Sequence, residues 1–127
     1  MKKEERRKAV RRPILESFSF FLTISGKTDY RLAVADVSTH GIGFYLDIDG
    51  IISPGLELTL GDEIEVNLYL NQTLYLPLKV KAVRIDKVEK RTQVGGEITD
   101  LKSKEYQSFK SFVSFLDSLT EVAYIEQ

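Results

Sequence analysis

Apolar and polar side chains alternate through most of the first hundred residues. The alternation is most regular in DEIEVNLYL, residues 62–70, where Ile64, Val66 and Leu68 share one face. A period of two is typical of strands with one buried face. Turn residues separate five such segments, and together they predict about six antiparallel strands. The predicted strands lie within residues 16–37 (a hairpin), 42–47, 62–70, 73–86 and 92–98.

The segment 73–86 contains a break in this alternation. Val83 and Ile85 are out of phase with Leu78 and the apolar residues before it. One extra residue in a strand resets the phase, so we expect a β-bulge near 81–82. Pro77 has no backbone donor, so this part of the strand is expected at a sheet edge or with its nitrogen facing solvent.

The hydrophobic period changes after Leu101. In KSKEYQSFKSFVSFLDSL, residues 102–119, apolar side chains recur every three or four residues, which predicts an amphipathic helix. Short strands linked by turns favour a closed barrel, and a single helix can cover its opening or an edge. The predicted fold is therefore mainly β: a six-stranded antiparallel β-barrel with a C-terminal α-helix.

Composition narrows the class of protein. The chain has 127 residues, 43% of them hydrophobic, which fits one domain with one core. No apolar run approaches the roughly 18 residues of a membrane span, and no signal peptide is apparent. With no cysteine and one histidine, disulfides are excluded and a bound metal or other cofactor is not expected. We expect a cytoplasmic protein.

Charge is concentrated at the N-terminus. Residues 1–12 carry seven basic and two acidic side chains, a net charge of +5, while the remainder carries eleven basic and seventeen acidic side chains, a net charge of −6. A nucleic-acid binder usually spreads basic groups over its folded body. An acidic body therefore argues against DNA or RNA as the main partner and leaves room for a small anion.

Two short stretches are candidates for ligand binding. RRKAVRR contains Arg7 and Arg11, and DVSTHG contains Asp36, Ser38 and Gly41. Taken alone, RRKAVRR is typical of a solvated tail. The second reads about equally well as a polar turn in which the glycine supplies a positive φ. Together they suit a guanine nucleotide, because arginine binds phosphate and the O6/N7 edge of guanine, and a carboxylate accepts from its N–H edge. No nucleophile, base and orienting group can be assembled, so an enzyme is not expected.

These motifs resemble the PilZ domain family, which is recognised by RxxxR followed by [D/N]xSxxG. The resemblance covers roughly residues 5–119 and includes VGGEI near the last strand. It implies a receptor for the bacterial second messenger cyclic di-GMP. It also implies a flexible arm at residues 1–12, a barrel with its helix at 13–120, and a tail at 121–127.

The resemblance also implies roles for individual residues. Arg7 and Arg11 would bind guanine and phosphate, while Asp36 and Ser38 would contact a guanine edge and Gly41 would shape the turn. Arg6 precedes the motif, as in members that bind the ligand as a stacked dimer.

The expected activity is signalling without catalysis. Ligand binding would order the arm and alter contacts with an unidentified effector protein, in processes such as motility, polysaccharide secretion or biofilm formation. One alternative is a PilZ-like interaction module that binds no nucleotide and works through the helix face, as a monomer or a weak helix-mediated homodimer. Another uses the arm for anionic lipid or nucleic acid.

Overall fold

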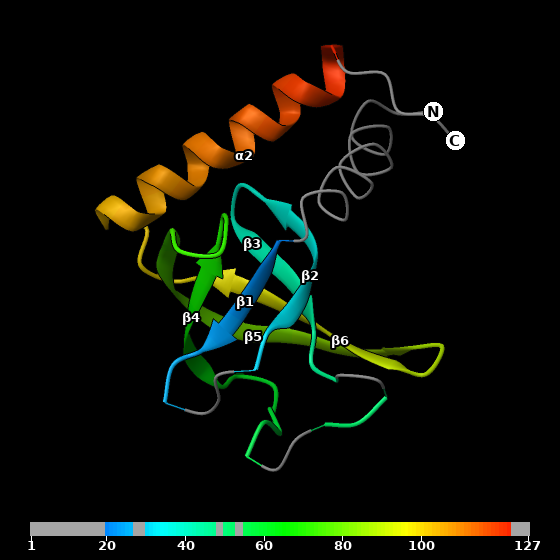
Figure 1. Cartoon of the computed structure of the whole chain (residues 1–127). Coiled ribbons are helices and arrows are strands. Elements are labelled where there is room, and N and C mark those ends of the chain that lie inside the picture. The colour runs from blue at the N-terminus through cyan, green and yellow to red at the C-terminus, as the bar shows by residue number, and fades with distance from the viewer. Residues whose placement is uncertain (1–19, 27–29, 48–49, 53–54, 123–127) are drawn as a thin grey trace.

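Six antiparallel strands form a closed barrel in the computed structural model, which describes residues 20–26, 30–47, 50–52 and 55–122. Around the barrel the strands follow the order β1-β2-β3-β6-β5-β4, and α2 crosses one end (Figure 1). The elements are β1 (Phe21–Ile24), β2 (Leu32–Ser38), β3 (Gly41–Tyr45), β4 (Glu63–Tyr69), β5 (Tyr75–Val88), β6 (Arg91–Ile98) and α2 (Lys104–Val122). The predicted fold class is confirmed.

The alternating segments bury their apolar faces as predicted. Ile64, Val66 and Leu68 of β4 are buried, and the residues between them are exposed or half-buried. The pairing of β1 with both β2 and β4 closes the barrel around these side chains. The largest fully buried side chains of the core are Phe44, Phe109, Leu22, Ile24, Leu32, Leu56, Leu68 and Leu116.

Pro77 lies within β5 without interrupting the sheet. It is opposite Asn67 of β4, and Leu70 N donates to Leu74 O (2.8 Å) at the hairpin end. Because bonded and non-bonded pairs alternate along an antiparallel ladder, the nitrogen of Pro77 points away from β4. On that side the described pairing of β5 with β6 begins at Val80. The proline therefore costs no hydrogen bond to β4. This agrees with the expectation that its nitrogen lies at a sheet edge or faces solvent.

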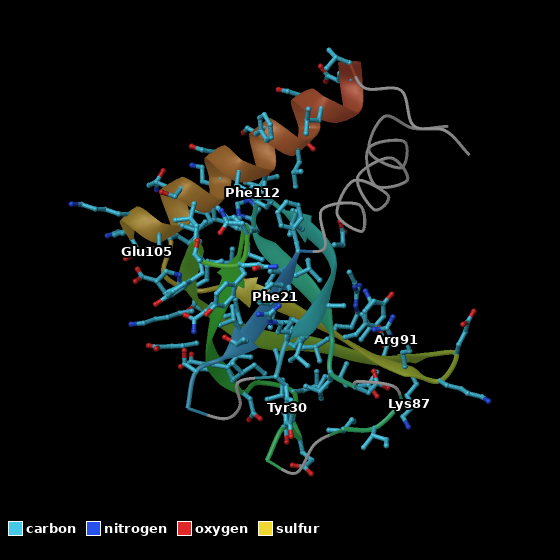
Figure 2. The ribbon with its side chains drawn as sticks, in the orientation of Figure 1. Phe21, Tyr30, Lys87, Arg91, Glu105 and Phe112 are labelled. Atoms are coloured by element: carbon cyan, nitrogen blue, oxygen red, sulfur yellow. The ribbon has the colours of Figure 1, made fainter. Side chains whose placement is uncertain are left out.

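The helix closes one end of the barrel. Its inward stripe consists of the buried residues Tyr106, Phe109, Val113 and Leu116. Ser103 caps the N-terminus, since its Oγ accepts from Tyr106 N at 3.0 Å. Phe112 points toward the barrel in Figure 2, and its ring packs edge-on against that of Phe20, with centroids 5.2 Å apart. Among the described residues, no helix combines the length and the apolar character needed to cross a membrane.

Candidate functional site

A β-bulge in β2 directs the DVSTHG motif toward the outer surface. Val34 pairs with Phe44 and Asp36 with Gly43, so Ala35 is the extra residue. Val34 and Ala35 are both buried, after which Asp36 is half-buried and Ser38 is exposed. Without the extra residue, strict alternation would turn Asp36 and Ser38 into the core. The bulge therefore presents the carboxylate and the hydroxyl on the outside of the barrel.

A second β-bulge, in β5, turns the side chain of Arg84 to the outside of the barrel. The register shifts between Ala82 and Arg84, which makes Val83 the extra residue. The predicted bulge near 81–82 is thus confirmed, displaced by about one residue. Val83 and Arg84 are both exposed, and Arg84 lies opposite Gly95 of β6. The shift brings a guanidinium to the face that carries the DVSTHG motif.

One row of residues connects the two bulged strands. Asp36 lies opposite Gly43, Gly43 opposite Gly95, and Gly95 opposite Arg84. The two middle positions have no side chain, so the carboxylate and the guanidinium stand on either side of a bare backbone floor. A flat floor between a hydrogen-bond acceptor and a planar cation suits a planar, polar ring.

The row lies in a hollow of about 570 Å³ on the outer surface of the barrel. That volume falls within the range of small-molecule sites, roughly 300–1,000 Å³. The lining combines acceptors from Asp36, Ser38 and Glu97 with donors from Arg84 and Gln93. Within the described part of the chain, the lining residues are Asp36, Val37, Ser38, His40, Gly41, Ile42, Gly43, Val83, Arg84, Gln93, Gly95, Gly96 and Glu97.

Gly41 is required by close packing and not by its backbone angle. It is absent from the described glycines with positive φ, so the expectation of a positive φ is wrong. A Cβ at this position would lie 2.7 Å from Gly96 O, far closer than two such atoms approach. The turn therefore packs directly on β6, and only glycine fits between the two strands.

The polar groups of the motif also have local partners. Asp36 Oδ1 accepts from Val37 N at 2.8 Å, and Ser38 Oγ donates to Gly41 O at 3.5 Å. The serine contact is long and weak, so its hydroxyl can exchange this bond for one to a ligand. The prediction that Asp36 and Ser38 bond to the backbone of the turn is thus correct. These bonds do not prevent either side chain from also contacting a ligand.

Arg84 is exposed and only weakly held. Its Nε lies 3.2 Å from Asp86 Oδ2, and its side chain is 67% exposed. The guanidinium also lies close to the floor, because a Cβ at Gly95 would be 3.6 Å from its Nε. Exposed ion pairs contribute little to stability, so the arginine can turn toward a bound anion or ring at low cost.

A second arginine of this hairpin, Arg91, has a different environment. Arg91 lies over the ring of Tyr45, 3.5 Å from its centroid, and Figure 2 shows Arg91 with Lys87 toward the outer end of the β5–β6 hairpin. Its cation is engaged on the aromatic face. Neither residue lines the hollow, and Arg84 is the arginine that the structured part of the chain contributes to it.

The structure brings together three of the predicted site residues. Asp36, Ser38 and Gly41 line one hollow. Arg6, Arg7 and Arg11 lie outside the described residues, as does the whole predicted arm. Among the described residues, no group of three or more histidines, aspartates or glutamates is placed to hold a metal ion.

Sequence reasoning missed the opposite side of the hollow. Arg84, Gln93, Gly95 and Glu97 come from β5 and β6, at least 46 positions beyond Ser38. Gly95 and Glu97 belong to VGGEI, which contributed to the family resemblance without being assigned a binding role, and nothing in the local sequence marks Arg84 or Gln93. The signal was indirect: the phase break at Val83 implied a bulge, and bulges redirect side chains next to binding sites.

Comparisons with known proteins identify the family and the fold. The family model for the PilZ domain matches residues 5–115. The fold is similar to that of the PilZ domain of YcgR from Escherichia coli with c-di-GMP, with a TM-score of 0.61 and 12% identity over 84% of this chain and 88% of that one.

Two longer proteins also share the fold. The Bacillus subtilis inhibitor of motility, MotI/DgrA, matches with a TM-score of 0.57 and 14% identity over 76% of this chain and 45% of that one. YcgR from Escherichia coli in complex with c-di-GMP gives a TM-score of 0.60 and 12% identity over 80% and 42%. The chain thus spans less than half the length of these two proteins, and no curated protein matches it. Because the family model covers most of its length, the chain belongs to the PilZ domain family.

Proposed function

We propose that this chain is a non-enzymatic receptor for cyclic di-GMP in the bacterial cytoplasm. The ligand lies in the hollow beside β2 and β3 and is held on its other side by the N-terminal arm, residues 1–12. The observation that carries the proposal is the row Asp36–Gly43–Gly95–Arg84, in which a carboxylate and a guanidinium flank a floor without side chains. YcgR and its PilZ domain, both solved with c-di-GMP, share this fold.

The barrel side recognises the base in this proposal. Asp36 accepts hydrogen bonds from the N1–H and amino edge of guanine, and Ser38 adds a hydroxyl. The glycine floor allows the purine ring to approach the backbone. Arg84 stacks on the ring or donates to its O6/N7 edge, because its guanidinium is planar and weakly restrained.

The arm supplies most of the positive charge. Among the described residues, the lining contains the carboxylates of Asp36 and Glu97 and one arginine, Arg84, a set that does not by itself favour a phosphate diester. Arg7 and Arg11 provide the missing donors in the proposal, and charge-assisted bonds to phosphate are among the stronger hydrogen bonds. Arg6 would favour a stacked ligand dimer.

Calorimetric titration with cyclic di-GMP tests the proposal. We expect binding by the wild type, and losses of about 1–3 kcal/mol in binding free energy for each of Arg7→Ala, Arg11→Ala and Asp36→Ala. A Lys102→Ala variant, which removes an exposed charge distant from the motifs in sequence, serves as the control and should bind normally. No heat from the wild type at several salt concentrations would exclude the receptor function.

Stoichiometry in the same titration tests the role of Arg6. Two nucleotides per chain are expected for the wild type, and one for Arg6→Ala, if Arg6 favours the stacked dimer. One nucleotide bound by both proteins would remove the dimer from the proposal and leave the receptor function in place.

Signalling follows from the order that the ligand imposes on the arm. Ordering a segment changes the surface that a partner meets, which is a common switching mode. Limited trypsin digestion measures this directly, because the arm holds seven lysines and arginines. We expect cyclic di-GMP to slow cleavage within residues 1–12, and unchanged cleavage at saturating ligand would contradict this mechanism.

A second candidate function is an interaction module that binds no nucleotide. The observation in its favour is the outer face of α2, where Phe115 is 60% exposed and Val122 is 73% exposed. Exposed apolar side chains on one helix can form a contact with a protein partner or a second copy. Light scattering of the wild type and Phe115→Ser separates these cases: a monomer at high concentration in both would exclude the homodimer.

A further inference from the structure

A tyrosine on α2 contacts the turn that carries the DVSTHG motif. Tyr106 Oη donates to Thr39 O at 3.0 Å and lies 3.3 Å from His40 Nδ1. Its side chain is 4% exposed, and neither Thr39 nor His40 belongs to the helix or to its immediate sequence. The helix that closes the barrel is therefore hydrogen-bonded to the loop between Ser38 and Gly41.

The two contacts share the single proton of the tyrosine hydroxyl. A phenol has one proton, and here Tyr106 donates it to the carbonyl of Thr39. With that proton used, His40 Nδ1 can bond to Tyr106 Oη in the tautomer that carries a proton on Nδ1. The tyrosine thus orients a side chain that lines the hollow as well as the backbone of the turn.

The β2–β3 pairing, which includes Ser38 opposite Gly41, closes the turn, and contacts from outside the hairpin add to it. The side-chain bond within the turn, from Ser38 Oγ to Gly41 O, is 3.5 Å long and weak. On the other side, Ile98 N of β6 donates to His40 O at 2.9 Å. The turn is held between β6 and Tyr106, so a change at either contact is transmitted to Ser38.

We infer that Tyr106 is a positioning residue of the hollow: its hydroxyl holds the turn at Thr39 and His40, and so couples the seating of α2 to the placement of Ser38. The coupling is reciprocal. A partner that moves the N-terminal half of α2 changes the affinity of the hollow for its ligand, and the ligand changes the affinity of the protein for that partner by the same factor. The ligand part of this inference rests on the proposed function, whereas the structural part does not.

The variant Tyr106→Phe removes only the hydroxyl and keeps the buried ring. The matched control is Tyr75→Phe, the same chemical change on β5 at a residue that does not line the hollow. Amide hydrogen exchange of the ligand-free proteins, followed residue by residue by NMR, is the first measurement. We expect exchange about five- to tenfold faster at Ile98 and Gly41 in Tyr106→Phe and no change there in Tyr75→Phe.

The second measurement is a double-mutant cycle with cyclic di-GMP as the probe. Tyr106→Phe should raise the Kd about fivefold. If it acts by placing Ser38, its effect should shrink to about twofold or less in a Ser38→Ala background. An undiminished effect in that background would overturn the positioning role, as would unchanged exchange at Ile98 and Gly41.

The two measurements separate this inference from the proposed function. If the wild type binds no cyclic di-GMP, the receptor function fails, and the exchange rates alone decide whether Tyr106 holds the turn. If the wild type binds and exchange is unchanged in Tyr106→Phe, the receptor stands and the positioning role is overturned.

Discussion

At the scale of single residues, Gly41 and Gly43 stand two positions apart on β3 and serve different purposes. A side chain at Gly41 would meet the backbone oxygen of Gly96 at 2.7 Å, and backbone atoms of a paired strand cannot move aside. A side chain at Gly43 would meet Gln93 Nε2 at 3.5 Å, an ordinary contact with the end of a side chain. The first glycine is needed for folding, and the second keeps the floor of the hollow flat.

Alanine substitutions test this difference. Gly41→Ala should lower the free energy of unfolding by about 1–3 kcal/mol, as overpacking does in a tight site. Gly43→Ala should change stability by less than about 0.5 kcal/mol and still weaken cyclic di-GMP binding, because its methyl group stands on the floor. Urea denaturation and calorimetry measure the two effects. Equal stability of both variants would contradict the packing argument.

Substitution of Arg84 should change ligand affinity with almost no effect on stability. The Arg84 side chain is 67% exposed and its ion pair with Asp86 is open to solvent. Removing the charge in Arg84→Ala should therefore change the free energy of unfolding by less than about 0.5 kcal/mol. The same variant should raise the Kd for cyclic di-GMP about tenfold, and Arg84→Lys should not restore it if planar stacking matters. Lys87→Ala, on the same hairpin outside the hollow, is the control. Wild-type affinity in Arg84→Ala would remove this residue from the site.

At the scale of elements, the two bulges show which features a single sequence reveals. Val83 and Ile85 break the phase of a strand in which apolar and polar residues contrast strongly, so the β5 bulge was predictable. The β2 bulge was not, because Val34, Ala35 and Val37 are all apolar and Ala35 is acceptable on either face. The barrel and the helix followed from periodicity. The β5–β6 side of the hollow depends on which strands become neighbours, and local pattern does not encode that.

The helix α2 supports a prediction about its two faces. Phe109 is completely buried, whereas Phe115, on the same helix, is 60% exposed. Phe109→Ala should lower the free energy of unfolding by about 3–5 kcal/mol, because it leaves a cavity under the helix. Phe115→Ala should cost less than about 0.5 kcal/mol in a monomer. Urea denaturation at two protein concentrations provides the check. A large loss in Phe115→Ala that depends on concentration would instead reveal an interface between copies.

At the scale of the whole molecule, charge separates the arm from the barrel. Residues 1–12 carry a net charge of +5 and the remaining residues −6. The described residues that line the hollow include two carboxylates, Asp36 and Glu97, and one arginine. A compact dinucleotide can place its phosphates against the arm and its base edges against the carboxylates. A long polyanion must also pass along the acidic body, where each phosphate is repelled.

Competition binding therefore distinguishes a specific receptor from a general polyanion binder. At about 150 mM salt, where charges beyond roughly 8 Å are screened, cyclic di-GMP should bind and a random single-stranded oligonucleotide should not displace it. Binding driven only by the arm would lose affinity steeply with salt and show no base preference. The variant Asp36→Asn sharpens the test, because it removes a carboxylate from the base site and leaves the arm intact. Asp36→Asn should weaken the binding of cyclic di-GMP, and the oligonucleotide should bind at least as tightly as it does to the wild type. Equal competition by the oligonucleotide, with no effect of Asp36→Asn, would assign the arm to polyanions and exclude recognition of the base by the hollow.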